Sequence, residues 1–240
     1  MRNFLQTVVF ENAHVICVDK PAGVLTVPAR DIKDTRPCLG LRIQQELKMH
    51  IYPVHRLDFE VSGLVIFAKN PQAHAALNRG FELRKVQKTY QAYAKKCKTI
   101  ASQNSSLPIV EEFAVGQTLT LKNKILRGKK RSYESPNGDF AETFVECMRE
   151  LKESCGNTCE FRLSPVTGRS HQLRLHLSQI GWPILGDVLY GADTPGKQNV
   201  IALRAIELEF KEWESKDSEK IKALGLPQSL CIPTSDCPLL

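Results

Sequence analysis

Residues 55–63 read His-Arg-Leu-Asp-Phe-Glu-Val-Ser-Gly, and Leu64–Ala68 follow at once as a continuous apolar run. A short apolar run of this kind is typical of a strand that is buried on both faces. The nonapeptide therefore predicts a polar loop that presents the carboxylate of Asp58 beside the start of a rigid strand. A single aspartate in a loop is more often a turn or cap residue, so this stretch alone leaves both interpretations open.

The segments around this loop predict a mixture of strands and helices. Val8–Phe10 and Val15–Val18 flank a turn and predict two short strands. Leu39, Ile43 and Leu47 recur at helical spacing, and Asn70-Pro71 fits the N-cap and first residue of a helix that runs to about Arg84. Further strands are expected at 89–94, 141–149, 159–163 and 206–210, and a loop at 98–112. Because the order lacks a regular βαβ rhythm, we expect an α+β fold with a mixed sheet flanked by helices.

One more helix is expected to begin at a Ser170 cap and to end at Gly181, and its residues divide into two faces. The apolar face is formed by Leu173, Leu177 and Ile180. The polar face is formed by His171, Arg174 and Ser178, and we expect it to border a cleft. His171 and His176 are five residues apart, which is not the i, i+4 spacing of a zinc-binding helix, so no metal is expected.

Composition is typical of a soluble globular protein, and the positive charge fits either a polyanionic partner or solubility alone. The chain has 240 residues, of which 42% are hydrophobic and 25% charged, and its net charge is +7. From Arg204 onward five basic and seven acidic residues give −2, so the preceding 203 residues carry 28 basic and 19 acidic residues, or +9. No apolar run approaches the roughly 20 residues of a membrane span. The start of the chain resembles no secretory signal, so we expect a cytoplasmic protein.

Neither the cysteines nor the glycines indicate a cofactor. The eight cysteines are scattered, and Cys155 and Cys159 lack the second pair that a zinc site would need. We therefore expect reduced thiols. No glycine-rich phosphate loop follows a predicted strand, so nucleotide cofactors receive no support.

Four motifs, in order along the chain, resemble those of the RluA family of pseudouridine synthases. HRLDFEVSG resembles the family signature HRLDxxTSG, and departs from it at Val61, where the family usually has threonine. Residues 18–23, VDKPAG, resemble the turn V-x-K-P-x-G, and residues 88–90, KTY, resemble the element K-x-Y. Residues 165–176, PVTGRSHQLRLH, with Gly186-Asp187 and Tyr190, resemble the C-terminal motif. The similarity spans about residues 8–210.

The resemblance implies a fold and an activity. The fold would be pseudouridine-synthase-like, with a largely antiparallel sheet and a central catalytic cleft in residues 1–212. Residues 213–240 would form a polar, loosely held C-terminal extension, and no separate N-terminal RNA-binding domain is expected. The protein would be an RNA pseudouridine synthase, an isomerase that needs no cofactor. It would act as a monomer on a structured tRNA or rRNA, such as a stem-loop, and would not bind membranes.

The motif positions also assign roles to individual residues. The resemblance makes Asp58 the nucleophile, which attacks either the uracil ring or the ribose, and makes Arg174 its charge partner. Tyr90 would pack on the target base and take part in proton transfer, and Arg56 would fill the gap left by the flipped base. The other residues expected at the base or the RNA are His55, Leu57, Leu173, Arg169 and His171.

A basic segment between Lys122 and Arg131 is a second candidate RNA contact. Six of its ten residues are basic, and Lys129, Lys130 and Arg131 are the strongest candidates for phosphate binding. The alternative is a solvated surface loop. Two further functions were weighed: an RNA-binding or RNA-folding factor without turnover, and a glycosidase-like hydrolase. The trio Asp58, Tyr90 and Arg174 favours catalysis over the first, and Glu60 is the only neighbouring carboxylate for the second.

Overall fold

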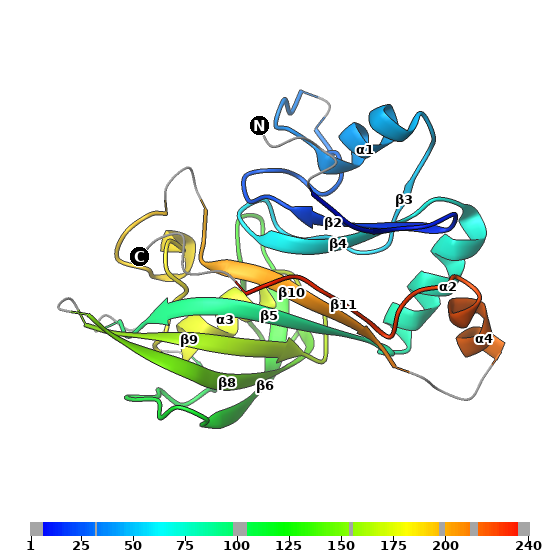
Figure 1. The fold of residues 1–240 in the computed structure, drawn as a ribbon. Helices are drawn as coiled ribbons and strands as arrows, with labels where there is room; N and C mark the ends of the chain where they lie inside the picture. The colour runs from blue at the N-terminus through cyan, green and yellow to red at the C-terminus, as the bar shows by residue number, and fades with distance from the viewer. Residues whose placement is uncertain are drawn as a thin grey trace. The chain divides into compact units, whose positions relative to one another are not determined.

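The computed structural model of the chain describes residues 7–31, 33–97, 105–153, 156–196, 200–211 and 216–234 (Figure 1). These residues form two compact units. Unit 1 lies within Met1–Lys88 and Ala205–Pro233, and unit 2 lies within Thr89–Arg204 and Thr234–Leu240. Two of the three boundaries fall inside strands β5 (Val86–Lys95) and β10 (Leu203–Phe210). The fold is a largely antiparallel sheet with few helices, which confirms the predicted α+β class.

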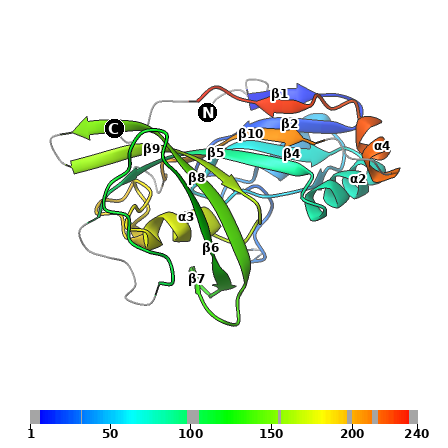
Figure 2. The same cartoon turned by 90° about the horizontal axis from the view of Figure 1, so that it is seen from below.

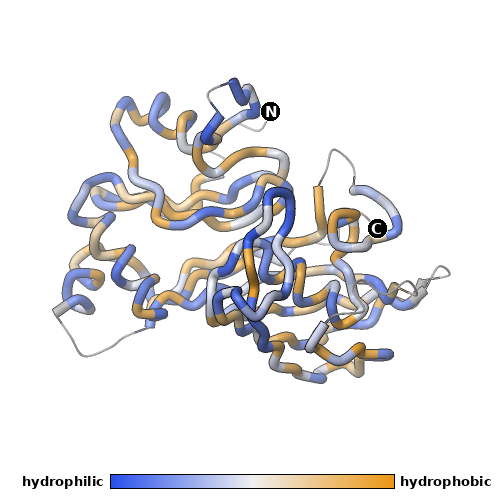
Figure 3. The backbone as a smooth tube through the Cα atoms, turned by 180° about the vertical axis from the view of Figure 1, so that it is seen from behind, coloured by the Kyte–Doolittle hydropathy of each residue, from blue (hydrophilic) through white to orange (hydrophobic). Residues whose placement is uncertain are grey.

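Unit 1 is built on the apolar strands that the sequence predicted. Its elements are β1 (Val8–Glu11), β2 (Val15–Lys20), α1 (Leu39–Leu47), β3 (Tyr52–Pro53), β4 (Ser62–Ala68), α2 (Pro71–Glu82), α4 (Lys216–Lys222) and β11 (Ser229–Cys231). Strands β1, β2, β4 and β10 follow one another in the sheet, β3 adds to β4, and β11 adds to β10. The apolar residues of β2 and β4 form the centre of the core, and their hydropathy can be followed along the tube in Figure 3.

The helix predicted after Asn70 is confirmed. The Asn70 side chain accepts a hydrogen bond from the Ala73 N–H, and Pro71 is the first helical residue of α2. Helix α4 lies beside α2 (Figures 1 and 2). The apolar side chains of Ala73 and Leu77 therefore close one end of the unit 1 core together with Ile221.

The expectation of a loosely held tail is wrong for the described residues 216–233. Helix α4 and strand β11 bury Ile221, Leu224, Leu230 and Ile232 in the core of unit 1. Strand β11 pairs antiparallel with β10, so that Leu208 faces Leu230. The segment looked polar because only about every third or fourth side chain is apolar, but these side chains point inward. Residues 212–215 and 235–240 lie outside the described part of the chain.

Unit 2 is a sheet in the order β5, β9, β8, β6, β7 with one buried helix on it. Its further strands are β6 (Thr118–Arg127), β7 (Ser132–Glu134), β8 (Asp139–Glu153) and β9 (Gly156–Pro165). All neighbouring strands in this order pair antiparallel: β5 with β9, β9 with β8, β8 with β6, and β6 with β7. Of the predicted loop 98–112, residues 98–104 lie outside the described part, and 105–112 contain no helix or strand.

Helix α3 (Gln172–Gln179) packs against β7 and β8 (Figure 2). The predicted Ser170 cap is wrong: His171 occupies the N-cap position, with a left-handed φ of 54°, and no side chain caps the helix. The hydroxyl of Ser170 is instead a hydrogen-bond partner of the Arg127 guanidinium. All eight residues of α3 are buried, so its polar face is not a solvent face.

None of the described helices is long and apolar enough to cross a lipid bilayer. The six described cysteines form no disulfide with one another, and four of them are buried. Cys155 and Cys237 lie outside the described residues. Burial raises the pKa of the Cys17 and Cys159 thiols to about 12, so both stay protonated at neutral pH.

Candidate active site

The loop that carries Asp58 joins β3 to β4 in unit 1, and its geometry depends on glycine at its end. Gly63 has φ of +112° at the start of β4, and a Cβ built on it would lie 2.1 Å from the carbonyl oxygen of Ala205. No side chain can therefore replace its hydrogen. Two residues earlier, the Val61 N–H donates to the Asp58 carbonyl at 3.2 Å and closes a tight turn. The Val61 side chain is buried.

Lys20 places a positive charge near Asp58. The Lys20 side chain is completely buried, and its ammonium donates to the carbonyl oxygens of Pro21 and Val24 at 3.0 and 2.7 Å. Burial lowers the pKa of Lys20 to about 8, while the negative charges of Asp58, Glu60 and Asp19 act in the opposite direction. The half-buried Asp58 thus has a cation in its surroundings, and Lys20 is a residue that our reasoning from the sequence did not assign to the site.

His55 belongs to the scaffold of the loop. Its Nε2 accepts a hydrogen bond from the Ile66 N–H at 3.2 Å, and its ring stacks on Phe81 with centroids 5.1 Å apart. Burial, and to a smaller extent the charge of Lys88, lowers the pKa of His55 to about 3. The ring is therefore neutral at physiological pH, and with Nε2 accepting, the proton is assigned to Nδ1.

In unit 2, Arg174 is held by a buried ion pair. Its guanidinium binds both carboxylate oxygens of Asp187, at 2.6 and 2.8 Å, and both side chains are at most 3% exposed. The same guanidinium lies 5.2 Å from the centroid of the Tyr190 ring. A bidentate pair with an aromatic face beside it fixes the direction of the arginine head group.

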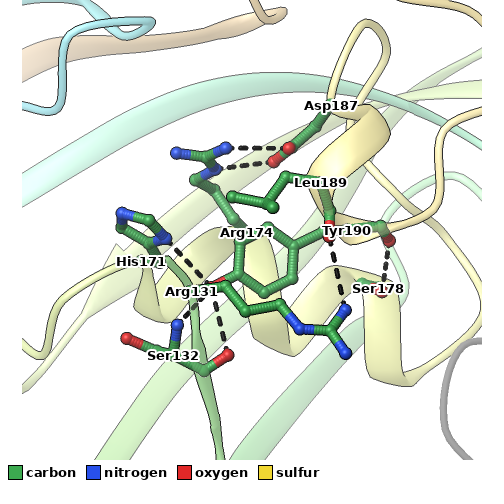
Figure 4. A network of polar contacts seen from close by, with 8 residues as sticks. All are labelled: Arg131, Ser132, His171, Arg174, Ser178, Asp187, Leu189 and Tyr190. Atoms are coloured by element: carbon green, nitrogen blue, oxygen red, sulfur yellow. Dashed lines mark hydrogen bonds and ion pairs between the residues drawn. The ribbon is translucent and has the colours of Figure 1, made fainter. Parts of the chain in front are cut away.

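Tyr190, from the short 3₁₀ helix η2 (Val188–Tyr190), joins the polar face of α3 to strand β7 (Figure 4). Its hydroxyl accepts from the Ser132 N–H at 2.8 Å and lies 3.0 Å from Nδ1 of His171. Ser178 donates to the Tyr190 carbonyl at 2.5 Å. The predicted grouping of His171, Arg174 and Ser178 on one face is thus confirmed, because all three contact this one residue.

Comparison with known proteins identifies the family. The family model described as RNA pseudouridylate synthase matches residues 14–179. The chain belongs to this family. It is 34% identical over 204 residues to the dual-specificity RNA pseudouridine synthase RluA of Vibrio vulnificus, a match that covers 85% of this chain and 76% of the relative. It is also 34% identical to the ribosomal large subunit pseudouridine synthase C of Rickettsia felis, over 76% of this chain and 55% of the relative.

A solved structure confirms the fold of this RNA pseudouridine synthase. The human RNA pseudouridylate synthase domain containing 1 superposes with a TM-score of 0.65 at 22% sequence identity. The match covers 85% of this chain and 78% of the human one. The resemblance to the RluA family, the fold class and the activity as an RNA-modifying isomerase are therefore confirmed.

The structure shows where each of the other predicted site residues of the synthase lies. Unit 1 contains His55, Arg56, Leu57 and Asp58. Unit 2 contains Tyr90, Arg169, His171, Leu173 and Arg174. Arg56 is exposed, and Leu57, Tyr90 and Leu173 are buried. The Arg169 guanidinium donates to the Phe140 carbonyl and pairs with Asp139 at 3.2 Å. The pairing of Arg174 with Asp58, and the contacts of all these residues with RNA, stay predictions.

The basic segment lies on β6 and on the turn that leads to β7. All six basic side chains are exposed. Lys122 pairs with Glu142 at 3.1 Å, and Arg131 reaches the Leu189 carbonyl at 3.5 Å. Lys129 and Lys130 lie at the tip of the turn, where a polyanion has open access to them.

Proposed function

We propose that the synthase converts specific uridines of tRNA, rRNA or both to pseudouridine, with Asp58 as the nucleophile. The names of the two relatives support an RNA substrate, and the ribosomal large subunit in one of them supports rRNA in particular. The reaction breaks the N1–C1′ bond of uridine, turns the uracil, and forms a C5–C1′ bond. The proton leaves C5 and one is gained at N1, so the atoms balance without an oxidant or a group donor, and no cofactor is required.

Asp58 is suited to carry out the first step of this reaction, which is an attack on the uracil ring or on the ribose carbon. A nucleophilic carboxylate must be ionised, and a nearby cation favours the charged form. Lys20 supplies one such cation. Arg174, whose direction is fixed by Asp187, is the proposed second one. In this proposal the two cations hold Asp58 charged when the RNA excludes water.

The target base has to leave its stack to reach the carboxylate. Extruding a nucleotide costs a few kcal/mol, which contacts to the flipped base and to its former neighbours must offset. Arg56 is exposed two residues before Asp58, and its planar guanidinium can stack where the uracil has left. Tyr90 would pack on the extruded uracil, between the buried side chains of Leu57 and Leu173. A stem-loop can present a uridine whose base is free to leave the stack. The proposed enzyme acts as a monomer in the cytoplasm.

The observation that carries this proposal is the position of Asp58 on an anchored loop, with the buried Lys20 ammonium among the charges that act on it. The test is pseudouridine formation on a stem-loop RNA under single-turnover conditions, with purified Asp58→Asn and Asp58→Ala proteins. We expect both to lose at least about 10⁴-fold in rate, because the neutral amide or methyl group cannot attack. Their RNA dissociation constants should stay within about threefold of the unmodified protein.

The matched control is Asp31→Asn, which removes an exposed carboxylate of the same unit. This variant should keep the full rate. Turnover by Asp58→Ala would exclude Asp58 as the nucleophile. Failure of the unmodified protein to modify any RNA that it binds would favour the RNA-binding alternative.

A further inference from the structure

The Asp58 loop has no strand ladder of its own, so its backbone groups depend on partners from elsewhere. Residues 54–61 lie between β3 and β4. Buried peptide groups without partners are costly, which makes the groups that bind them important for the shape of the loop. The side chain of Thr26 binds Leu57, the residue that precedes Asp58.

The hydroxyl of Thr26 binds both backbone groups of Leu57. It accepts a hydrogen bond from the Leu57 N–H at 3.1 Å and donates one to the Leu57 carbonyl oxygen at 3.0 Å. A hydroxyl has one proton and two lone pairs, so a single oxygen can do both. Thr26 is 2% exposed and Leu57 is also buried, so water does not compete for these bonds.

Thr26 is itself fixed by the start of helix α1. Its carbonyl accepts from the Gly40 N–H at 3.2 Å, and the neighbouring Leu25 exchanges hydrogen bonds with Pro37 and Leu39 at 2.9 and 2.8 Å. A Cβ on Gly40 would lie 3.1 Å from the Thr26 carbonyl oxygen, so the two segments are in close contact. The hydroxyl is therefore presented from a rigid support.

Two further contacts hold the loop on either side of Asp58. The pairing between β3 and β4 ends at Pro53 and Phe67. The next residue of β4, Ile66, donates its N–H to the His55 side chain instead. After Asp58, the Phe59 carbonyl accepts from the Gly23 N–H at 2.8 Å. Of these three anchors, Thr26 acts on the residue that directly precedes Asp58.

We infer that Thr26 is a positioning residue for Asp58, and this inference rests on the proposed role of Asp58 as the nucleophile. Thr26 does not touch the carboxylate. It fixes the peptide from which the Asp58 side chain extends. Because a displacement of about 1 Å at a reacting group can cost about 100-fold in rate, loss of this clamp should slow the chemical step.

Replacement of Thr26 by valine tests the inference, because valine keeps the shape of threonine and removes both hydrogen bonds. We expect Thr26→Val to lower the single-turnover rate at saturating stem-loop RNA by about 10- to 100-fold, with an RNA dissociation constant within about twofold. Thr26→Ser keeps the hydroxyl and should restore the rate to within about threefold. A role in stability alone would not produce this separation of rate from affinity.

Thr158→Val is the matched control. The Thr158 hydroxyl is also buried but has no hydrogen-bond partner among the described residues, so its removal should leave the rate unchanged. Full activity of Thr26→Val, or a Thr26→Ser protein as slow as the valine variant, would overturn the inference. If Asp58→Asn is inactive in the same assay, that result would leave the proposed function standing.

A measurement on the unmodified protein guards against variants that fail to fold. If the clamp exists in solution, the Leu57 amide should exchange its hydrogen for deuterium as slowly as the amides of β4, although it lies in a loop. Exchange as fast as that of the exposed turn at Lys129 and Lys130 would refute the clamp, whatever the variants show.

Discussion

Lys20 shows how much of the site depends on a single buried charge. A lysine is rarely buried completely, because its ammonium loses its hydration. Here two carbonyl oxygens replace part of that hydration, and the carboxylates of Asp58, Glu60 and Asp19 supply the compensating charge. The motif V-x-K-P-x-G pointed to this position, but no pattern in the sequence shows that the side chain is buried and interacts with the charge of Asp58.

The lowered pKa of Lys20 predicts opposite effects of alkaline pH on rate and on stability. Between pH 8 and about 10.5 the folded protein loses the Lys20 proton while the unfolded chain still holds it. The unfolded state then binds more protons, so the contribution of Lys20 to the free energy of unfolding rises with pH. The single-turnover rate should fall in the same range, since the positive charge near Asp58 disappears.

The comparison of the unmodified protein with Lys20→Met measures both effects. The single-turnover rate and the free energy of unfolding in urea are recorded from pH 7 to pH 10. The difference between the two proteins in each quantity should change with pH. The methionine variant should be slower at pH 7 and should lack the decline in rate that the unmodified protein shows above pH 8. A decline of equal size in both proteins would assign it to another group.

At the scale of elements, helix α3 is the part whose environment differs most from the expectation. Its periodicity predicts two faces correctly, but the polar face is buried against other polar side chains. His176, for example, lies 2.9 Å from the Thr143 hydroxyl and 3.0 Å from the Asn123 amide oxygen. These partners are 33 and 53 residues away in sequence, and only the pairing of β6 with β8 brings them together.

The His176 network predicts a loss of stability in mild acid. Burial lowers the pKa of His176 to about 4, against about 6.5 in the unfolded chain. Between these values the unfolded state binds the extra proton, so the stability contributed above pH 6.5 is lost as pH falls toward 4. The loss should reach about 3 kcal/mol.

Urea unfolding at pH 7.0 and pH 4.5 checks this prediction. The unmodified protein should lose more stability between these values than His176→Gln, which has no group to titrate at this position. His50→Gln, at an exposed histidine, should behave like the unmodified protein. An identical loss in all three proteins would show that the acid sensitivity arises elsewhere.

Local signals in the sequence were sufficient for some elements and not for others. Asn70-Pro71 fixes the start of α2, because the cap uses only neighbouring atoms. The helix α4 and strand β11 were missed because their few apolar side chains become significant only beside the core of unit 1. The same holds for Thr26, whose partner Leu57 is 31 residues away. Predictions therefore failed where a residue acts through a distant partner.

For the molecule as a whole, the net charge of +7 predicts an affinity for RNA that depends on salt. The question is whether this affinity comes from the total charge or from particular places. Lys129, Lys130 and Arg131 are exposed on one turn, and no acidic residue occurs from Phe113 to Tyr133. This concentration of charge favours direct phosphate contacts by the turn.

Neutralising Lys129, Lys130 and Arg131 with glutamine should weaken RNA binding at every salt concentration. It should also reduce the slope of log Kd against log salt by about 2 to 3, since each lost phosphate contact lowers it by roughly 0.7 to 0.9. The control protein has glutamine at the exposed Lys33, Lys48 and Lys211, and carries the same net charge. Equal slopes for the two triple variants would show that only the total charge matters.

The contact between Gly63 and Ala205 also bears on how the protein is made. Strand β4 stands beside β10 in the core of unit 1, and 142 residues separate Gly63 from Ala205. At a ribosomal rate of about 5–20 residues per second, roughly 7 to 28 seconds pass between the synthesis of these two residues. During that interval the nascent chain carries Asp58 and its apolar strand without the neighbour that completes their support. The loop of Asp58 is thus synthesised early, and the support that Ala205 gives to Gly63 is completed only when the C-terminal strands emerge.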